Sequence, residues 1–171
     1  MFKEEKTIAV ANFIIETAKH NNKLITNLQL QKILFFIQGY VLKETNHELF
    51  NSKFSKWQYG PVEKQIYRIF RDNGSAPITD EFENAYFDDN GSFIEDVPLM
   101  TKTNLENESL FNKIQALTIN LLDIPAWKLV GLTHRDPSWY KDKETIMNYS
   151  APDYSSDEIK KCYQNSELSF K

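Results

Sequence analysis

The residue types that most often serve as nucleophiles, bases or metal ligands are rare in this chain of 171 residues. They are three histidines and one cysteine: His20, His47, His134 and Cys162. His134 is followed by Asp136 and Ser138, which are the residue types of a hydrolytic triad. A triad depends on three-dimensional geometry, and residues two positions apart seldom face each other, so this spacing does not predict one. A histidine near a helix end more often bonds the free carbonyl groups there. We therefore expect no catalytic residue and a protein that is not an enzyme.

Metal and nucleotide cofactors lack their usual sequence signatures. The chain has no HExxH or CxxC motif, and one cysteine cannot supply a thiolate zinc site. It contains only five glycines, and none of them has the spacing of a dinucleotide-binding or phosphate-binding loop. We therefore expect no metal and no cofactor.

No segment is typical of a membrane span or a secretion signal. The longest unbroken apolar run is residues 33–37, whereas a spanning helix needs about 20 residues. Residues 1–6 are charged and lead into no signal-peptide core, and a lone cysteine gives no disulfide framework. We expect a cytoplasmic protein with no membrane partner.

Charge is distributed unevenly along the chain, whose net charge is −4. Residues 1–71 carry 11 Lys or Arg against 6 Asp or Glu, and residues 72–171 carry 9 against 18. No Lys or Arg lies between Arg71 and Lys102, and that stretch holds eight carboxylates: Asp72, Asp80, Glu81, Glu83, Asp88, Asp89, Glu95 and Asp96. An acidic chain is a poor candidate for neutralising phosphates, so a nucleic-acid partner is not expected. The acidic stretch is either a solvated surface or a surface that binds a cationic partner.

Helical periodicity dominates the sequence. Apolar residues recur at intervals of three and four over Thr7–His20. Thr26 and Gln29 fit a capping box, and the helix that follows is apolar nearly all round as far as Leu42. We expect this helix, at about 26–42, to lie at the centre of the fold with Phe36 buried.

Turn and capping signals place the remaining elements. Gly60-Pro61 is expected to open a third helix, Asn104 to cap a fourth, and Pro125 to open a fifth. Asp88-Asp89-Asn90-Gly91 predicts the turn of a hairpin within residues 78–98, and Ser155 to Glu158 forms another capping box. The predicted fold class is mainly α with a small β-hairpin (α+β): a compact single-domain helical bundle over residues 1–171.

Aromatic residues are frequent, at 13%, and two groups of them could bind a partner. Trp57, Tyr59 and Trp139 lie beside turns that contain proline, where they are either core anchors or exposed interface residues. The hairpin places aromatic and acidic side chains together: Tyr86, Phe87, Asp88, Asp89 and Phe93. These eight residues are the predicted partner-binding residues.

Three ordered segments carry a family resemblance. Residues 30–39 resemble the motif Leu-x-Lys-Leu-x-Tyr-Phe-x-x-Gly through Lys32, Phe36 and Gly39. Residues 57–62 are similar to Trp-x-x-Gly-Pro-Val through Gly60 and Pro61. Thr133 and His134, followed by Trp139, resemble a third element in which Thr-His precedes Pro-Trp. Together these motifs resemble the Panacea domain family, which includes SocA-type bacterial antitoxins and many phage-associated proteins. The resemblance spans about residues 8–140 and leaves 141–171 as a C-terminal helical extension.

The resemblance implies a non-enzymatic antitoxin that binds and neutralises the toxin of a toxin–antitoxin pair. It also implies an alternative, an adaptor that delivers a toxin to a ClpXP-type protease. A third possibility is a DNA-binding autoregulator, whose basic face would be drawn from Lys23, Lys32, Lys53, Lys56, Lys64, Arg68 and Arg71. The motif residues themselves are expected to be structural.

Overall fold

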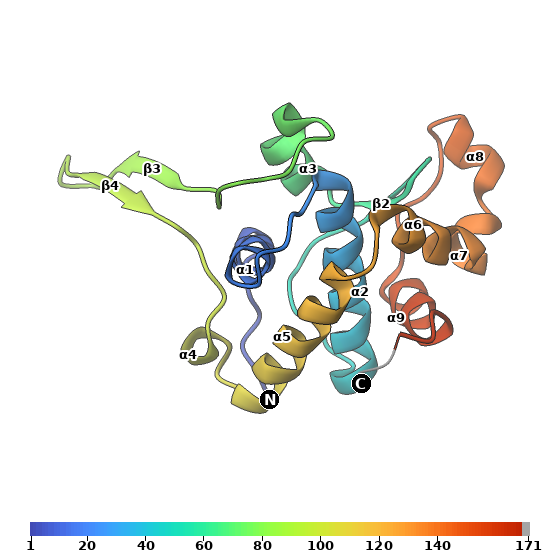
Figure 1. Cartoon of the computed structure of the whole chain (residues 1–171), viewed down its shortest axis with the longest axis horizontal. Helices are drawn as coiled ribbons and strands as arrows, with labels where there is room; N and C mark the ends of the chain where they lie inside the picture. Colours follow the sequence, from blue (N-terminus) through green and yellow to red (C-terminus); the bar gives the residue numbers. More distant parts are fainter. Residues whose placement is uncertain (169–171) are drawn as a thin grey trace.

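A long central helix organises the computed structural model, which describes residues 1–168. This helix, α2 (Asn27–Thr45), runs between α1 (Thr7–His20), α5 (Glu108–Leu122) and α9 (Ser156–Asn165) (Figure 1). Nearly all of its residues as far as Leu42 are buried, including Phe36 with no exposed surface. The predicted central helix and the burial of Phe36 are therefore confirmed.

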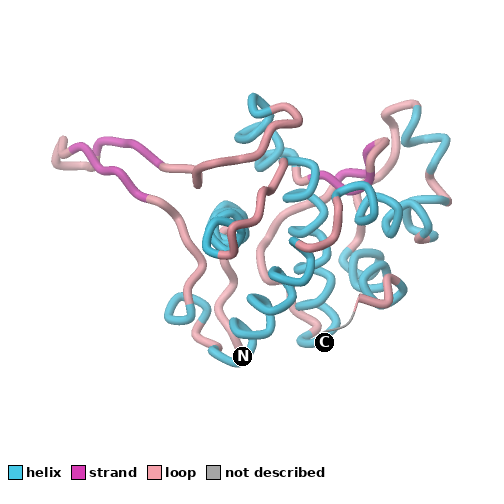
Figure 2. Tube along the Cα trace, in the orientation of Figure 1, coloured by secondary structure: helices cyan, strands magenta, loops and turns pink. Residues whose placement is uncertain are grey.

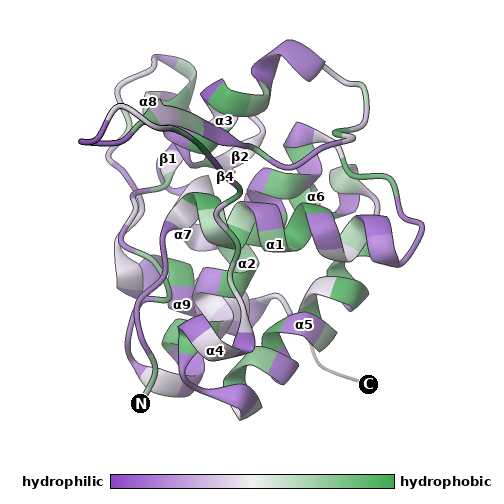
Figure 3. Cartoon of the chain, turned by 90° about the vertical axis from the view of Figure 1, so that its left-hand side faces the viewer, coloured by the Kyte–Doolittle hydropathy of each residue, from purple (hydrophilic) through white to green (hydrophobic). Residues whose placement is uncertain are grey.

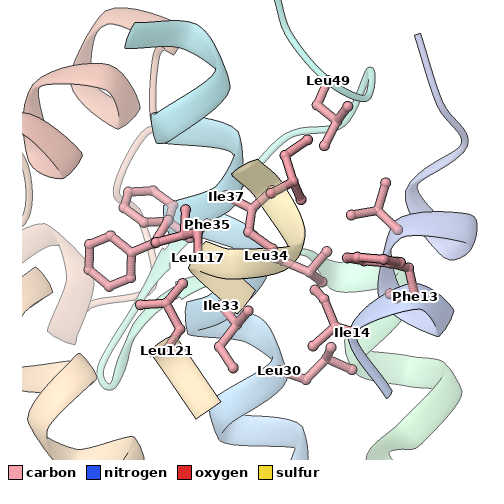
Figure 4. Packing of buried hydrophobic residues seen from close by; sticks show 14 of the residues in the cluster. Phe13, Ile14, Leu30, Ile33, Leu34, Phe35, Ile37, Leu49, Leu117 and Leu121 are labelled. Carbon is pink, nitrogen blue, oxygen red and sulfur yellow. The ribbon is translucent and has the colours of Figure 1, made fainter. Parts of the chain in front are cut away.

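The core lies where α2 meets α1 and α5. Leu30 of α2 lies beside Ile14 of α1, and Ile33 lies beside Leu121 of α5 (Figure 4). These side chains are fully buried, and burial of an aliphatic side chain of this size contributes about 1.5–3 kcal/mol. The apolar circumference of α2 thus fixes its place because every face of the helix has a partner.

The start of α2 differs from its prediction in one bond. The Thr26 hydroxyl accepts a hydrogen bond from the Gln29 amide, as expected for an N-cap. The Gln29 side chain does not return to Thr26; it donates to the carbonyls of Leu122 and Ile124 at 3.3 and 3.0 Å. The capping-box prediction was half wrong, because the C-terminal end of α5 offers this amide two carbonyl acceptors.

The fourth predicted helix is divided into two. Thr101 caps the short helix α4 (Lys102–Leu105), and Asn107 caps α5. Glu106 between them has a left-handed backbone with φ of 58°, which a continuous helix cannot contain. Asn104 is therefore not the cap that the sequence suggested.

The C-terminal segment joins the main core. It comprises α6 (Ala126–Arg135), α7 (Pro137–Tyr140), α8 (Lys143–Met147) and α9. The capping box of Ser155 and Glu158 is confirmed at the start of α9. A Cβ placed on Gly39 would lie 2.7 Å from Tyr163 Cβ, so this glycine is what allows α9 to approach α2 closely. The predicted C-terminal extension is packed against the central helix.

Two antiparallel hairpins complete the fold of residues 1–168, and their strands are drawn in magenta in Figure 2. The first pairs β1 (Ser55–Trp57) with β2 (Gly60–Val62), and the second pairs β3 (Asn84–Phe87) with β4 (Phe93–Asp96). The second hairpin and its turn were predicted, whereas the first was not. The mainly α fold with a small β part is confirmed.

The first hairpin replaces a predicted helix start. Gly60 has φ of +93°, a conformation that opens no helix, and Pro61 pairs with Lys56 across the ladder. Helix α3 (Lys64–Phe70) begins only after Glu63, whose carboxylate accepts from the Ile66 amide at 2.7 Å. A short 3-10 turn, η1 (Arg71–Asn73), follows α3.

The second hairpin extends away from the helical body (Figure 1). In the view turned by 90° it lies toward the viewer, in front of the helices (Figure 3). We call β3, β4 and their turn, residues 84–96, the arm. Among residues 1–168, no helix combines the length and the hydrophobicity that crossing a bilayer requires.

Candidate functional site

Three of the motif residues meet at the first hairpin. Lys32 comes from α2, Gly60 from β2 and Thr133 from α6. A Cβ on Gly60 would lie 2.6 Å from Thr133 Oγ1 and 2.9 Å from Lys32 Cε. The glycine therefore lets three elements that are distant in sequence come into contact, which supports a packing role for these residues.

Lys32 is completely buried beneath the hairpin. Its ammonium donates a hydrogen bond to the Pro61 carbonyl at 2.9 Å, and no carboxylate within residues 1–168 forms an ion pair with it. Removal from water lowers the pKa of Lys32 to about 7. The side chain thus ties α2 to β2 through a hydrogen bond to a carbonyl, with no carboxylate of residues 1–168 paired with its ammonium.

His134 and Trp139 hold the turn of the same hairpin. Their rings stack with centroids 3.9 Å apart. His134 Nε2 lies 2.9 Å from the Gln58 carbonyl and must donate to it, and Trp139 Nε1 donates to the Trp57 carbonyl at 2.9 Å. Burial lowers the pKa of His134, which favours the neutral ring. Both side chains therefore hold the β1–β2 turn in place through hydrogen bonds to its backbone carbonyls.

Asp136 and Ser138, the residue types of a hydrolytic triad near His134, bond to each other. The Asp136 carboxylate accepts from the Ser138 amide at 3.0 Å and from its hydroxyl at 2.5 Å, and it caps α7. His134 contacts Gln58 and Trp139 instead. The three residue types are therefore not arranged as nucleophile, base and orienting acid.

A buried ion network, which the sequence did not reveal, joins β1 to the C-terminal segment. Lys56 has a fully buried side chain whose ammonium lies 2.6 Å from Asp142 and 2.9 Å from Glu158. Lys141 approaches Glu158 at 3.1 Å. Burial raises the pKa of Glu158, but bonds from the Ser155 amide, Lys56 and Lys141 outweigh it and hold that pKa at about 2. Lys56 lies 86 residues from Asp142 and 102 residues from Glu158 in the sequence, so no local sequence signal predicts these two ion pairs.

The predicted partner-binding residues divide into exposed and buried members. On the arm, Tyr86, Phe87 and Phe93 have exposed fractions of 51%, 71% and 57%. Trp57 and Tyr59 are 36% and 49% exposed at the first hairpin. Trp139 is only 4% exposed, so it is a core anchor and cannot belong to an exposed binding surface.

The two turn aspartates of the arm differ in role. Asp88 accepts from the backbone amides of Asn90 and Ser92 at 2.9 and 2.8 Å, so it shapes the turn. Asp89 is exposed. Sequence reasoning treated them as equivalent, and only Asp89 is available as a free surface charge.

The predicted partner-binding residues leave out the exposed aromatic residues Trp127, Tyr140 and Tyr149. Trp127, in the first turn of α6, is 63% exposed, and its ring lies 5.4 Å from that of Tyr59. A tryptophan between an alanine and a lysine directly after Pro125 was a signal that could have found it. Trp127 and Tyr59 together make a second exposed aromatic pair.

Within residues 1–168, no group of three histidine, cysteine or acidic side chains could hold a metal ion. Cys162 is 1% exposed, and burial raises the pKa of its thiol, which disfavours the reactive thiolate.

Comparison with known proteins places the motif cluster in a family. The model of the family described as "Antitoxin SocA-like, Panacea domain" matches residues 30–140. The protein named Antitoxin SocA from Caulobacter vibrioides (strain NA1000 / CB15N) is 41% identical over 70 residues, which cover 41% of this chain and 37% of that relative. The chain is thus matched to little more than a third of that relative's length. No solved structure matches. Since the family match covers more than half of the chain and includes every motif residue that meets at the first hairpin, the chain belongs to the SocA-like antitoxin family with a Panacea domain.

Proposed function

We propose that this protein is the antitoxin of a toxin–antitoxin pair, and that it neutralises its toxin by direct protein–protein contact without catalysis. Family membership and the similarity to a SocA antitoxin support the antitoxin role. The observation that supports direct contact is the arm, where three large aromatic side chains are more than half exposed. Exposed aromatic clusters of this kind are typical of interface residues that contribute most of the binding energy.

The arm also carries a charge suited to a cationic partner. Asp89, Glu95 and Asp96 are exposed, and no Lys or Arg within residues 1–168 forms an ion pair with them. Toxins that act on nucleic acids or nucleotides tend to have positive active sites, because their substrates are phosphates. A negative surface with aromatic anchors would therefore speed association with such a toxin and cover its active site.

The contacts of the polar residues support a non-enzymatic role. His134 and Asp136 bond within the structure, and the Cys162 thiol is buried. None of these groups faces a site with a second group positioned for acid–base or nucleophilic chemistry.

Co-expression with the neighbouring open reading frame tests the proposal. That frame should be toxic alone and harmless beside this protein. The proposal is lost if the frame is harmless alone or stays lethal in the presence of this protein.

Two further measurements distinguish the alternatives. If neutralisation disappears in cells that lack a ClpXP-type protease, and toxin turnover falls at the same time, the protein is an adaptor instead of a blocking antitoxin. A shift of its own promoter DNA by the purified protein would point to autoregulation. We expect neutralisation without the protease and no promoter shift.

A further inference from the structure

A cavity of ≈ 690 Å³ lies beside the first hairpin. Its walls come from the first turns of α2, from the β1–β2 hairpin, from α3 with the segment to Gly74, and from the end of α8 with the residues that follow it. This volume lies within the range of about 300–1,000 Å³ typical of small-molecule sites. The arm contributes no lining residue and extends from the other side of α2 (Figure 1).

One wall of the cavity is aromatic. Trp57 and Tyr67 both line it, and their rings meet edge to face with centroids 5.0 Å apart and an angle of 71°. Leu28, Val62 and Ile146 add apolar surface. Trp57 remains 36% exposed, so a flat group could pack against its ring.

The polar lining has an excess of positive charge. Lys64 and Arg71 are exposed at the cavity, and Arg71 forms a solvent-exposed ion pair with Asp72 at 3.8 Å. Lys32 lines the cavity with a buried ammonium that no carboxylate within residues 1–168 balances. Among residues 1–168, Asp153 is the one carboxylate that lines the cavity, and it accepts a hydrogen bond from the Ser55 hydroxyl.

Lys56 does not add to this excess. It also lines the cavity, but Asp142 and Glu158 neutralise its ammonium. Of the other lining cations, Lys64 forms no ion pair within residues 1–168 and Arg71 pairs only with the exposed Asp72, so the cavity lining is positive in a protein whose net charge is −4.

We propose that this cavity binds a small anionic ligand that carries a flat ring, with the ring against Trp57 and the anion at Lys64 and Arg71. The anion is a phosphate, as in a nucleoside monophosphate, or a carboxylate, as in an aromatic acid; both offer charged oxygens to these cations. Lys32, when protonated, strengthens the attraction because its ammonium is shielded from water. This site is separate from the arm, and it does not depend on the antitoxin proposal.

Titration calorimetry on the purified full chain tests the site with three probes: adenosine 5′-monophosphate, adenosine and indole-3-acetate. We expect saturable binding of at least one anionic probe, and adenosine, which lacks the charge, to bind at least about tenfold more weakly. Preference for the monophosphate assigns a phosphate ligand, and preference for indole-3-acetate assigns a carboxylate. If neither anion binds with a Kd below about 1 mM, or if adenosine binds as well as the monophosphate, the proposal is wrong.

Matched charge removals locate the binding. The double substitution Lys64→Gln and Arg71→Gln should weaken the binding of the anionic probe at least about tenfold, because each substitution removes a charge-assisted hydrogen bond. The control is the double substitution Lys53→Gln and Arg68→Gln, since both residues are exposed and neither lines the cavity. Both variants change surface residues and should keep the wild-type Tm. Equal losses in the two variants would place the anion outside the cavity and overturn the proposal.

Discussion

The two hairpins of this protein are similar in size but opposite in environment. The β1–β2 hairpin is held from three elements by Lys32, His134 and Trp139, and a two-stranded hairpin needs such packing to be stable in water. The arm relies on its own strand pairing, on the Phe87–Phe93 contact at 5.5 Å and on the Asp88 turn bonds. The motif residues Lys32, Gly60 and Thr133 meet at the first hairpin, whereas the arm carries a cluster of exposed aromatic and acidic side chains. The contacts of these three motif residues pack the fold together, and the surface of the arm that we expect to bind a partner contains no motif residue.

The largest contrast concerns two phenylalanines. Phe54, directly before β1, is fully buried against Phe35 at 5.3 Å, and Phe93 on the arm is 57% exposed. Phe54→Ala should lower the free energy of unfolding by about 3–5 kcal/mol through lost burial and a cavity. Phe93→Ala should lower it by at most about 1 kcal/mol, because it removes one cross-strand contact with Phe87. Urea denaturation measures both, and equal losses would contradict the difference in packing.

Two glycines with positive φ sharpen the comparison. Gly60 has φ of +93° and no room for a Cβ, whereas Gly91 in the arm turn has φ of +77° and nothing within 4 Å. Gly60→Ala should cost about 2–5 kcal/mol, the sum of backbone strain and steric overlap. Gly91→Ala should cost only the strain, about 1–2 kcal/mol. If thermal denaturation gives the two variants the same Tm, the close approach of Lys32 and Thr133 to Gly60 is wrong.

A second glycine pair tests whether the C-terminal segment belongs to the buried region. Gly39→Ala would place a Cβ 2.7 Å from Tyr163 Cβ and 2.9 Å from the Ile159 carbonyl oxygen, so it should cost about 1–3 kcal/mol. A Cβ added at Gly131 would have no atom within 4 Å, so Gly131→Ala should stabilise its helix by up to about 1 kcal/mol. A gain in stability for Gly39→Ala would mean that α9 does not pack on α2.

The smallest expected effect is the pH dependence that Lys32 gives to the free energy of unfolding. Its pKa is about 7 in the folded protein and 10.5 in the unfolded chain, so below pH 7 both states carry the charge and the wild type bears the full cost of burying it. Between pH 7 and 10.5 the folded state loses the proton while the unfolded state keeps it, and wild-type stability rises. The stability advantage of Lys32→Met over the wild type should therefore shrink by about 1 kcal/mol from pH 7 to 8.

Taking the difference between the two proteins removes titrations that they share, such as that of Cys162. A stability difference that stays constant over this pH range would show that Lys32 is not buried as a charged group.

The sequence predicted the elements with strong local signals. The apolar circumference of α2, the Asn-Gly turn of the arm and the capping box at Ser155 each depend on residues close together in the chain. The β1–β2 hairpin was missed because Gly60-Pro61 fits both a helix start and a strand after a turn. The choice depends on Lys32 and Thr133, which are 28 and 73 residues away from Gly60 in the sequence.

Predictions of the site were limited in the same way. The exposed aromatic residues of the arm follow from the hairpin, but Trp139 was included among the partner-binding residues because nothing local shows that His134 stacks on it. The different roles of Asp88 and Asp89 arise from turn hydrogen bonds that the residue types alone do not specify. The ion network of Lys56 and the cavity beside it require segments about 90–100 residues apart to meet.

The central claim, that the arm binds the toxin, is tested most directly by the association rate with the product of the neighbouring open reading frame at low ionic strength. The arm variant combines Asp89→Lys with Glu95→Lys and leaves Asp88 in place, because Asp88 holds the turn. The control combines Glu4→Lys with Glu144→Lys, two exposed sites far from the arm in sequence with the same total charge change. We predict that the arm variant associates at least about tenfold more slowly than the wild type and that the control associates at the wild-type rate. An arm variant that associates as fast as the wild type would contradict the claim.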